Sequence, residues 1–324
     1  MSDCSTVPSS RRSVAPVALS GSSWSGSGCE GIDVNDARGT RKLNFRDQLT
    51  VATWNCGGLS FTTREALTDY CDILVLTETH DNGVLKENKL FITGEPAPTN
   101  DPYAGVSFLL SERVAKCIIH KGSLGSRITY IKVKCSPRDL FIIGVYIPHK
   151  QRQNKPFASD TLKDLRSVIS KAKPRDCLIV LGDFNSKLGR CVDNLTGQWC
   201  VHKHSCKSGK NILELMRQSN LTAVSTLFQP PRHKTNATYL AKDPQYKPSQ
   251  IDYILISKRW ASSVKDCKVR WEKSIQRWGR HYDHTVVMCT IKSKIRAEKK
   301  ANLRPRDFKA LKILPKFVTH MNNV

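Results

Sequence analysis

Short apolar segments, rich in β-branched residues, recur between residues 48 and 293, and each is bounded by Gly, Pro, Asn, Asp or charged residues. This composition and spacing are typical of β-strands. The pattern predicts nine strands, in the segments LTVATW (49–54), ILVLT (73–77), VSFLL (106–110), CIIH (117–120), ITYIKVK (128–134), LFIIGVYI (140–147), CLIVLG (177–182), IDYILI (251–256) and HTVVMCTI (284–291).

Helical periodicity is found in three segments. In residues 159–173 the apolar positions follow helical spacing, and Ser159 or Asp160 is the expected N-cap. Residues 209–220 show the same spacing. A short helix is also predicted at residues 64–69. Many strands with few helices, not in strict alternation, favour an α/β fold in which helices cover packed sheets. The apolar residues expected on the buried helix faces are Leu162, Leu165, Ile169, Ile212, Leu213 and Met216.

The chain divides into three parts. Residues 1–45 are rich in Ser and Gly and lack apolar periodicity, so we expect them to be disordered. Residues 48–293 contain all the predicted strands and should form one folded domain. Residues 294–324 are a basic tail, which is either a solvated segment or an arm that contacts nucleic acid.

The excess of positive charge narrows the class of partner. Lys and Arg total 52 against 28 Asp and Glu, which gives a formal net charge of +24. Such an excess suits a polyanion, because neutralising phosphates releases condensed counterions. An anionic lipid surface, or a basic tail that only aids solubility, also fits the charge alone. No segment approaches the roughly 20 apolar residues of a membrane span, so we expect no membrane partner.

The cysteine pattern bears on the cellular compartment. The 12 cysteines are scattered along the chain without the tight, even spacing of a disulfide framework. The first 20 residues contain no apolar stretch long enough for a secretion signal. We therefore expect reduced thiols and an intracellular protein.

One cluster of Cys and His residues is a candidate zinc site. Cysteine and histidine side chains are common zinc ligands, but ligands only two residues apart are not a common spacing for such a site. A basic surface loop is the favoured reading of this segment. The cluster consists of Cys191, Cys200, His202, His204 and Cys206.

Polar side chains occur where the predicted strands end, and a strand that ends in an acid or amide presents that group at a sheet edge, where a site can form. Taken singly, most have an ordinary explanation: Asn55 precedes two glycines, as in a turn, and Tyr146 precedes a proline. Asp252 is harder to dismiss, since an acid buried without a partner costs several kcal/mol. The full set is Asn55, Glu78, Tyr146, Asp183, Asn185, Asp252, Asp283 and His284.

Six short motifs follow one another over residues 48–293, in the order TWN, LTE, VYIP, GDFN, QIDYI and DH. In this order and spacing they resemble the endonuclease/exonuclease/phosphatase superfamily, which includes DNase I and the exonuclease III-type repair nucleases. The resemblance implies a four-layer α/β sandwich, in which two packed mixed β-sheets are flanked by helices. It also implies a metal-dependent phosphodiester hydrolase.

Within that superfamily the chain looks most like the endonuclease of non-LTR (LINE-type) retrotransposons. The segments GKNILELMRQSNL, ATY followed by QIDYILISKRW, and RPRDFKALK carry this resemblance. It implies DNA as the partner, a nuclear location and no obligate protein partner. Two alternatives stay open: an abasic-site repair endonuclease, and a domesticated protein that binds nucleic acid without cutting it.

The resemblance also assigns roles to the polar set. For the metal, it implies Glu78 as the main ligand of Mg²⁺ (or Mn²⁺), with Asn55 beside it and Asp283 assisting. Carboxylate and amide oxygens are ligands that such hard cations prefer.

For the chemistry, the resemblance implies that Asp183 orients and deprotonates the attacking water. Asn185 would hold that water or a phosphate oxygen, and Tyr146 would hydrogen-bond to the scissile phosphate. His284 would contact a non-bridging oxygen, with Asp252 behind it fixing its tautomer and raising its pKa.

Three positions depart from the family pattern. Abasic-site nucleases carry Asp where this chain has Gly57, and Trp where it has Ser249, which places an abasic-sugar pocket in doubt. The Ser that usually precedes the final DH is Tyr282 here.

Overall fold

The folded part of the chain begins slightly earlier than expected. Our computed structural model describes residues 41–44, 46–81, 86–99, 101, 103–149, 155–243, 245–271 and 283–292. The predicted basic tail, Tyr282 and most of the segment expected to be disordered therefore lie outside the described residues. Leu43 and Asn44 form a short strand, and Leu43 is buried. Within the described part, no helix has the length and apolar content that a membrane span requires.

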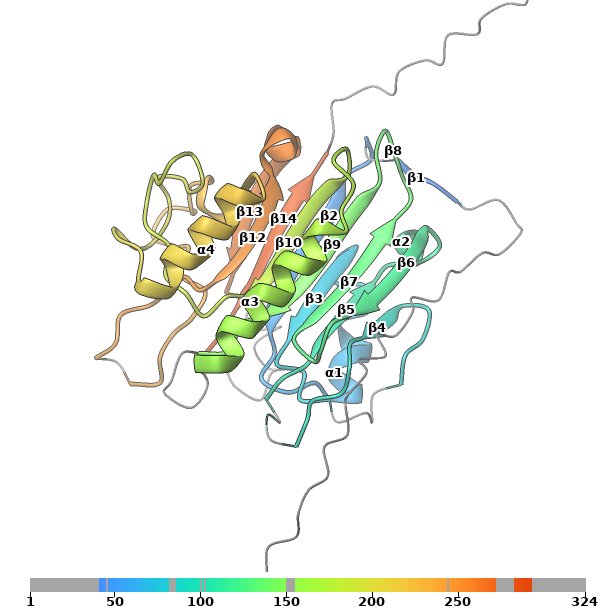
Figure 1. Cartoon of the computed structure of the whole chain (residues 1–324), viewed down its shortest axis with the longest axis horizontal. Helices are drawn as coiled ribbons and strands as arrows, with labels where there is room; N and C mark the ends of the chain where they lie inside the picture. Colours follow the sequence, from blue (N-terminus) through green and yellow to red (C-terminus); the bar gives the residue numbers. More distant parts are fainter. Residues whose placement is uncertain are drawn as a thin grey trace, which may run out of the picture.

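Two six-stranded sheets organise the fold (Figure 1). The first has the strand order β13-β14-β2-β3-β5-β4 and the second β11-β12-β10-β9-β7-β6, while β1 pairs with β8. Both large sheets are mixed, because β2–β3 and β9–β10 are parallel and the other neighbours are antiparallel. The strands are β1 Leu43–Asn44, β2 Leu49–Asn55, β3 Ile73–Thr77, β4 Phe91–Thr93, β5 Val106–Leu110, β6 Ile118–Ser123, β7 Ile128–Val133, β8 Cys135–Ser136, β9 Leu140–Tyr146, β10 Cys177–Asp183, β11 Leu221–Ala223, β12 Asp252–Ser257, β13 Val264–Arg270 and β14 Val286–Ile291.

All nine predicted strands are present in these sheets. The sequence pattern missed β1, β4, β8, β11 and β13. The first four are only two or three residues long. The fifth, β13, is an edge strand with four charged residues, and an edge tolerates polar side chains that a central strand would exclude.

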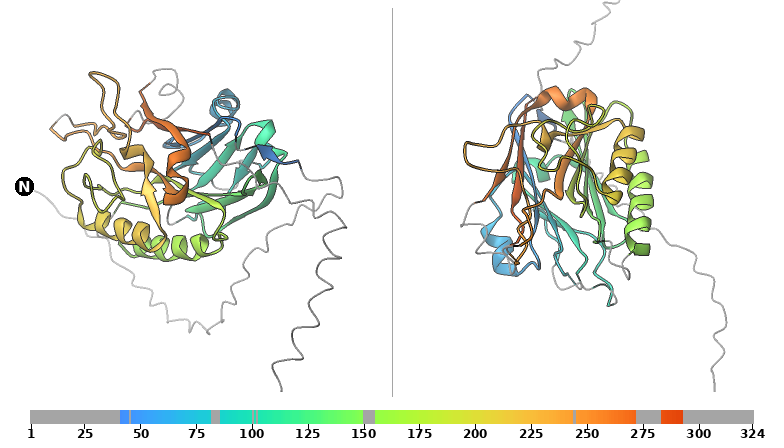
Figure 2. Two further views of the ribbon diagram at one scale, coloured as in Figure 1. Left: turned by 90° about the horizontal axis from the view of Figure 1, so that it is seen from above. Right: turned by 90° about the vertical axis from the view of Figure 1, so that its left-hand side faces the viewer.

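Helices complete the predicted four-layer sandwich (Figure 2). Helices α3 and α4 lie on the outer face of the second sheet, and α1 lies against the first. The core between α3, α4 and the second sheet is continuous, and a smaller core surrounds α1. The helices are α1 Phe61–Ala66, α2 Glu112–Ala115, α3 Lys155–Ser170 and α4 Lys207–Gln218, with 3₁₀ helices η1 Val224–Thr226 and η2 Lys258–Ser263.

Two helix starts differ from the prediction. Helix α3 begins at Lys155, so Ser159 and Asp160 lie inside it and neither caps it. Pro156 permits the earlier start, because a proline in the first turn lacks only an N–H that would have no partner in the helix. Helix α1 begins at Phe61 rather than residue 64, since the Ser60 hydroxyl accepts the N–H of Thr63 at 3.1 Å.

The helix faces largely follow the predicted pattern. Ile212, Leu213 and Met216 of α4 are buried, as are Leu162 and Leu165 of α3. In α3 the third position on the sheet side is taken by Val168, which is fully buried, while Ile169 is only half-buried.

The two sheets pack face to face around the largest core. Gly144 of β9 marks how closely they approach. A Cβ at this position would lie 2.8 Å from a methyl carbon of Val75 and 2.9 Å from one of Val106. The glycine therefore lets strands of opposite sheets come close together, and this tight contact fixes the sheets whose ends carry the site.

Candidate active site

The ends of five strands, β2, β3, β9, β10 and β12, bring the predicted polar residues to one edge of the sandwich. Asp183, the last residue of β10, pairs in register with Tyr146 on one side and with Asp252 on the other. In the other sheet, Asn55 ends β2 opposite Thr77, so that Glu78 follows directly beside it. The core positions of these strands therefore determine where the polar groups lie.

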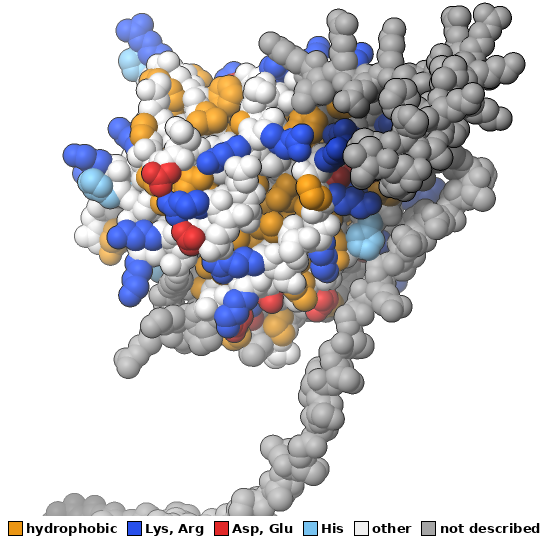
Figure 3. Space-filling model, turned by 45° about the horizontal axis from the view of Figure 1, so that its top comes forward, with side chains coloured by type: hydrophobic (Ala, Val, Ile, Leu, Met, Phe, Trp, Pro, Cys, Tyr) orange, Lys and Arg blue, Asp and Glu red, His pale blue; other side chains and the backbone are white. Residues whose placement is uncertain are grey.

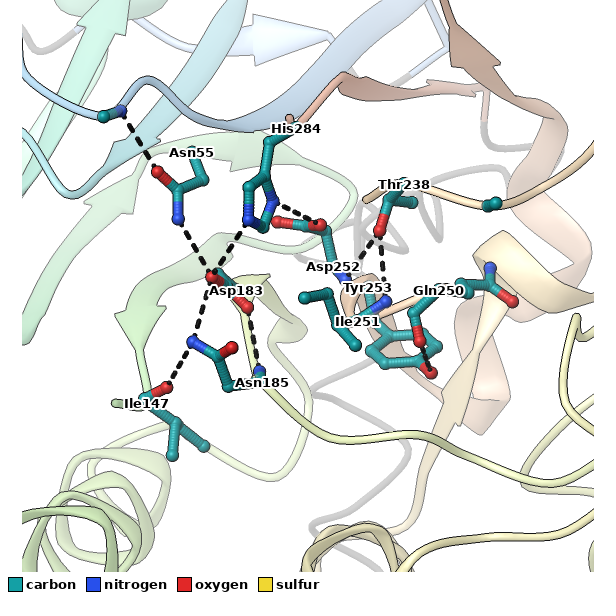
Figure 4. Close-up of polar contacts among 12 residues, drawn as sticks. Asn55, Ile147, Asp183, Asn185, Thr238, Gln250, Ile251, Asp252, Tyr253 and His284 are labelled. Atoms are coloured by element: carbon teal, nitrogen blue, oxygen red, sulfur yellow. Dashed lines mark hydrogen bonds and ion pairs between the residues drawn. The ribbon is translucent and has the colours of Figure 1, made fainter. Parts of the chain in front are cut away.

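Asp183 is the centre of the cluster (Figure 4). It is fully buried, and the Asn55 amide crosses from the other sheet to donate to its Oδ2 at 3.0 Å. Asn185 donates twice, from its side chain to Oδ2 at 3.1 Å and from its backbone N–H to Oδ1 at 2.8 Å. Burial, together with the nearby charge of Asp252, raises the pKa of Asp183. A carboxylate with a raised pKa is suited to accept a proton.

Gly182 allows the strand to present Asp183 in this way. Its φ is +149°, and a Cβ there would lie 1.9 Å from the carbonyl oxygen of Val145. Only glycine fits such a backbone without displacing the neighbouring strand. The glycine of GDFN is therefore a geometric requirement of the site.

Asp252 and His284 form a buried pair beside this centre. The His284 Nδ1 lies 3.0 Å from Asp252 Oδ2, and its Nε2 lies 4.0 Å from Asp183 Oδ2. Burial lowers the pKa of His284, but the charge and hydrogen bond of Asp252 outweigh it and raise the pKa to about 10. At neutral pH the imidazole is therefore a cation, and both of its nitrogens are donors.

The Thr238 hydroxyl supports this pair from behind. It accepts the backbone N–H groups of Ile251 and Asp252, each at 3.1 Å. The next residue, Tyr239, forms isolated bridges with Ser249 and His284, and its ring centroid lies 5.0 Å from that of His284. The ATY segment was noted in the sequence for its resemblance to the retrotransposon endonucleases, but no site role was assigned to Thr238 or Tyr239.

Glu78 takes a left-handed backbone conformation, with a φ of 51°, and His80 follows with a φ of 52°. The His80 Nε2 lies 3.7 Å from Glu78 Oε2. Burial raises the pKa of Glu78, but the nearby polar side chains of His80, Asn55 and Tyr146 outweigh burial and leave the pKa below its usual value. A positive φ is uncommon for non-glycine residues, and in this chain it also occurs at Cys191, Asp193 and Asn194. Sequence analysis missed His80, which the fold places beside Glu78.

Tyr146 is buried, and burial together with the charge of Glu78 raises the pKa of its hydroxyl well above the usual range. The hydroxyl therefore stays protonated and is available as a donor at the site.

These groups line an open pocket of about 1080 Å³. The pocket wall includes Asp283, and it includes three lysines that the sequence analysis did not select, Lys187, Lys207 and Lys247. Their charges favour an anionic ligand. The remaining predicted residues on the wall are Asn55, Glu78, Tyr146, Asn185 and His284, and Asp183 and Asp252 stand directly behind them.

Residues 52–269 match the model of the endonuclease/exonuclease/phosphatase family. The chain belongs to this family. Its members act on phosphoester bonds, so membership supports a phosphoester hydrolase of the nuclease or phosphatase kind and confirms the resemblance drawn from the sequence.

Relatives and solved structures of the family cover most of the chain. The Craniofacial development protein 2 of Bos taurus is 25% identical over 265 residues, which are 77% of this chain and 42% of that protein. The chain thus spans less than half the length of this curated relative. A 3′ phosphatase, NExo from Neisseria bound to a product DNA hairpin, matches with a TM-score of 0.55, 20% identity, and coverage of 76% and 100% of the two chains. The endonuclease domain of TRAS1, a telomere-specific non-LTR retrotransposon, matches with a TM-score of 0.52, 14% identity, and coverage of 78% and 100%. These two structures show a shared fold.

The donor set fits the divalent cation expected of the family at Glu78 rather than at the buried pair. Among the described residues, one group of three possible ligands lies close together, formed by Asp183, Asp252 and His284. All three of these side chains are buried, and His284 Nδ1 and Asp252 Oδ2 already contact each other at 3.0 Å. Glu78 is an ionised oxygen donor on the pocket wall, and Asn55 and Asp283 lie on the same wall.

The Cys/His cluster does not assemble into a zinc site. The Cys200 thiol is buried and donates to the Leu188 carbonyl, and His202 Nε2 accepts the N–H of Gln250. Cys206 instead caps α4, where its sulfur accepts the N–H of Gly209. The segment packs as a loop around its own hydrogen bonds.

Two departures from the abasic-site pattern also have local explanations. Gly57 has a φ of 55° and donates its N–H to the side chain of Asn55, so the turn itself favours glycine. Ser249 lies on the pocket wall and pairs with Tyr239 through two backbone hydrogen bonds.

Proposed function

We propose that this protein is a Mg²⁺-dependent DNA endonuclease that nicks duplex DNA, as the endonucleases of non-LTR retrotransposons do. One observation carries the proposal: Glu78 and His284 line one pocket together with three lysines, and the buried carboxylate of Asp183 lies directly behind that wall. Phosphodiester hydrolysis needs a base for water, neutralisation of developing charge and a donor for phosphate oxygen. The pocket supplies a candidate for each.

Asp183 is the proposed base. Its carboxylate receives three hydrogen bonds from Asn55 and Asn185, which hold its orientation, and its raised pKa favours taking a proton from water. Asn185 also donates to the Ile147 carbonyl at 3.0 Å, so its amide plane is fixed from both sides. We propose that it positions the attacking water or one phosphate oxygen.

His284 is the proposed donor to a non-bridging phosphate oxygen. Its Nδ1 is engaged by Asp252, which leaves Nε2–H directed towards the side of Asp183. Tyr146, protonated and on the same wall, is a second donor. Glu78, with Asn55 and Asp283, would hold the Mg²⁺ ion. That ion, when bound, would supply positive charge against the phosphate oxygens and the leaving oxygen.

DNA is favoured as the substrate by the charge. The net charge of +24 and the lysines on the pocket rim suit a long phosphate backbone better than a single small phosphate ester. The abasic-site nuclease remains a weaker proposal, because Gly57 and Ser249 stand where those enzymes carry Asp and Trp. A nuclear location follows from the substrate alone and stays a prediction.

A plasmid-nicking assay tests the proposal. Supercoiled plasmid would be incubated with the full chain, with Mg²⁺ or with EDTA, beside an oligonucleotide that carries one abasic site. Mg²⁺-dependent conversion to open circle without preference for the abasic site is the expected result. A strong preference for the abasic oligonucleotide would instead identify a repair nuclease.

Glu78→Gln separates an enzyme from a protein that only binds. The substitution keeps the shape of the side chain and removes the charge proposed to hold Mg²⁺. We expect nicking to fall by roughly 10²–10⁴-fold, as for loss of one catalytic group, while the affinity for DNA is retained. If wild type and variant bind DNA equally and neither cuts it, this result would contradict the proposed catalytic function and favour a protein that binds nucleic acid without cutting it.

A further inference from the structure

A second cluster of basic residues lies at the end of the sandwich away from the pocket. It joins the turn after α3, the 3₁₀ helix η2 and the adjoining ends of β13 and β14, at the top of the molecule in Figure 1. Figure 3, which brings this top forward, shows more Lys and Arg than Asp and Glu side chains on the visible surface. We call this cluster the basic end face; its members are Lys173, Arg175, Lys258, Arg259, Lys265 and Lys292.

Backbone contacts draw these residues together from distant parts of the sequence. Arg259 Nη1 donates to the Pro174 carbonyl at 3.1 Å, which fixes η2 against the turn that carries Lys173 and Arg175. Lys292 N–H donates to the Ser263 carbonyl at 2.8 Å, which places the end of β14 against the end of η2. The cluster is therefore set by the fold and is not an accident of one charged stretch.

The charges of the basic end face are not neutralised by nearby acids. Within the described part of the chain, none of its six side chains forms an ion pair. The two closest acids in sequence, Asp176 and Asp266, are paired with Lys132 and Lys268. Five of the six residues are exposed, and Lys258 is half-buried. Unpaired cations held close together repel one another, so an anionic partner that neutralises them is favoured.

The basic end face is too far from the pocket to serve the same phosphates. β10 runs from Cys177, beside the turn at residues 171–176, to Asp183 at the active site. Six residue steps of a strand span about 20 Å. A duplex that lies over Asp183 thus leaves this cluster free.

We propose that the basic end face binds a second segment of nucleic acid through its phosphate backbone, while the first segment occupies the pocket. Trp260 of η2 is buried, and the large aromatic side chains that are exposed in the described residues, Phe61, Tyr103 and Tyr246, belong to other segments. The face therefore offers charge rather than base stacking, and DNA and RNA backbones share the required chemistry. The proposal concerns binding and does not depend on whether the pocket cuts DNA.

The test compares two triple variants of the full chain that lose the same charge. One carries Lys173→Gln, Arg175→Gln and Arg259→Gln in the basic end face. The control carries Lys89→Gln, Lys121→Gln and Lys163→Gln, which lie outside both this face and the pocket wall. Since Arg259→Gln also removes a contact to Pro174, the double variant Lys265→Gln and Lys292→Gln repeats the test without that contact.

The dissociation constant for a short labelled DNA duplex, and for an RNA duplex of equal length, would be measured over a range of salt concentrations. Each lost phosphate contact should reduce the slope of log K against log salt by about 0.9 for B-DNA, so the triple variant should lose about 2–3 in slope and the double variant about 1–2. Sedimentation at low salt should give two duplexes bound per wild-type molecule and one per basic-end-face variant. The plasmid-nicking rate at saturating substrate should be unchanged.

Equal slopes and equal stoichiometry in the basic-end-face and control variants would overturn the proposal. So would loss of binding to phosphatidylserine vesicles with unchanged binding of both duplexes, which would identify a lipid surface. A wild-type protein that does not nick plasmid, yet shows the expected difference in slope, would contradict the proposed function and leave this inference standing.

Discussion

Replacing Asp252 by Asn should change the pH range in which the enzyme works. The carboxylate lies 3.0 Å from His284 Nδ1 and is the strongest of the groups that raise the pKa of that imidazole. Asparagine keeps the size of the side chain and removes its charge. Burial, which lowers the pKa of His284, is then opposed only by the more distant Asp183 and Asp283.

The magnitude follows from the raised pKa. The change from 6.5 to about 10 corresponds to roughly 5 kcal/mol at about 1.4 kcal/mol per pKa unit, as an upper bound for all groups together. Losing the main contributor should return the pKa of His284 to near its ordinary value. Wild type would keep a protonated His284 throughout the neutral range, whereas the variant would lose about tenfold in nicking per pH unit above pH 7.

The assay is the nicking rate from pH 6 to pH 9 at saturating Mg²⁺ and plasmid, with thermal unfolding measured at each pH. A raised histidine pKa also stabilises the fold. That contribution is complete below the unfolded pKa of about 6.5 and is lost as pH rises through about 10. The variant should therefore lose stability relative to wild type mainly at neutral and lower pH. A variant whose pH–rate profile runs parallel to that of wild type would refute the role given to the pair.

Three further outcomes are expected. Asp72 accepts hydrogen bonds from Thr50, Ser111 and Arg113, and its pKa is lowered because the bonds from Arg113 and Thr50 outweigh its burial. Asp72→Asn should therefore lower the unfolding free energy by about 2–3 kcal/mol at pH 7. In denaturant titrations the difference from wild type should shrink once pH falls below the unfolded pKa of 3.8 and vanish below the folded pKa, and a constant difference down to that pH would contradict this. Gly182→Ala should abolish nicking through the clash with Val145, whereas Gly125→Ala, which meets nothing within 4 Å but shares a positive φ, should leave nicking within a few-fold. His80→Ala should lower kcat and raise the Mg²⁺ concentration for half-maximal activity, since it removes a partner of Glu78; an unchanged Mg²⁺ dependence would exclude that role.

The apolar pattern predicted most of the fold because the central strands are buried on both faces. Every residue of β9 and β10 is buried, and such continuous apolar segments are easy to detect. The edge strand β13 was missed because one of its sides faces solvent. The start of α3 was misplaced because Ser159 and Asp160 are residue types that commonly cap helices, whereas here both lie inside the helix.

The sequence predicted which polar residues belong to the site, but not how they are arranged or which other residues support them. The strand ends pointed to eight polar residues, and the fold brings all of them to the pocket or directly behind it. His80 and Thr238 could not be found in this way. His80 is distinguished only by its contact with Glu78 in the folded chain. Thr238 acts through its hydroxyl, which accepts the backbone N–H groups of residues 13 and 14 positions further along the chain.

The bridge of Tyr239 to both Ser249 and His284 has a mechanical consequence. Residues 240–248 leave and return through the Tyr239–Ser249 pair, and Ala241 and Lys247 from this segment line the pocket. The outer rim and the catalytic histidine are thus attached to the same short piece of backbone. If the proposed DNA substrate displaces this segment, we expect the displacement to reach His284 through the Tyr239 bridge, so that a poorly fitting sequence would be bound and yet cut slowly. In such an arrangement, discrimination between targets would appear in the turnover rate more than in the affinity.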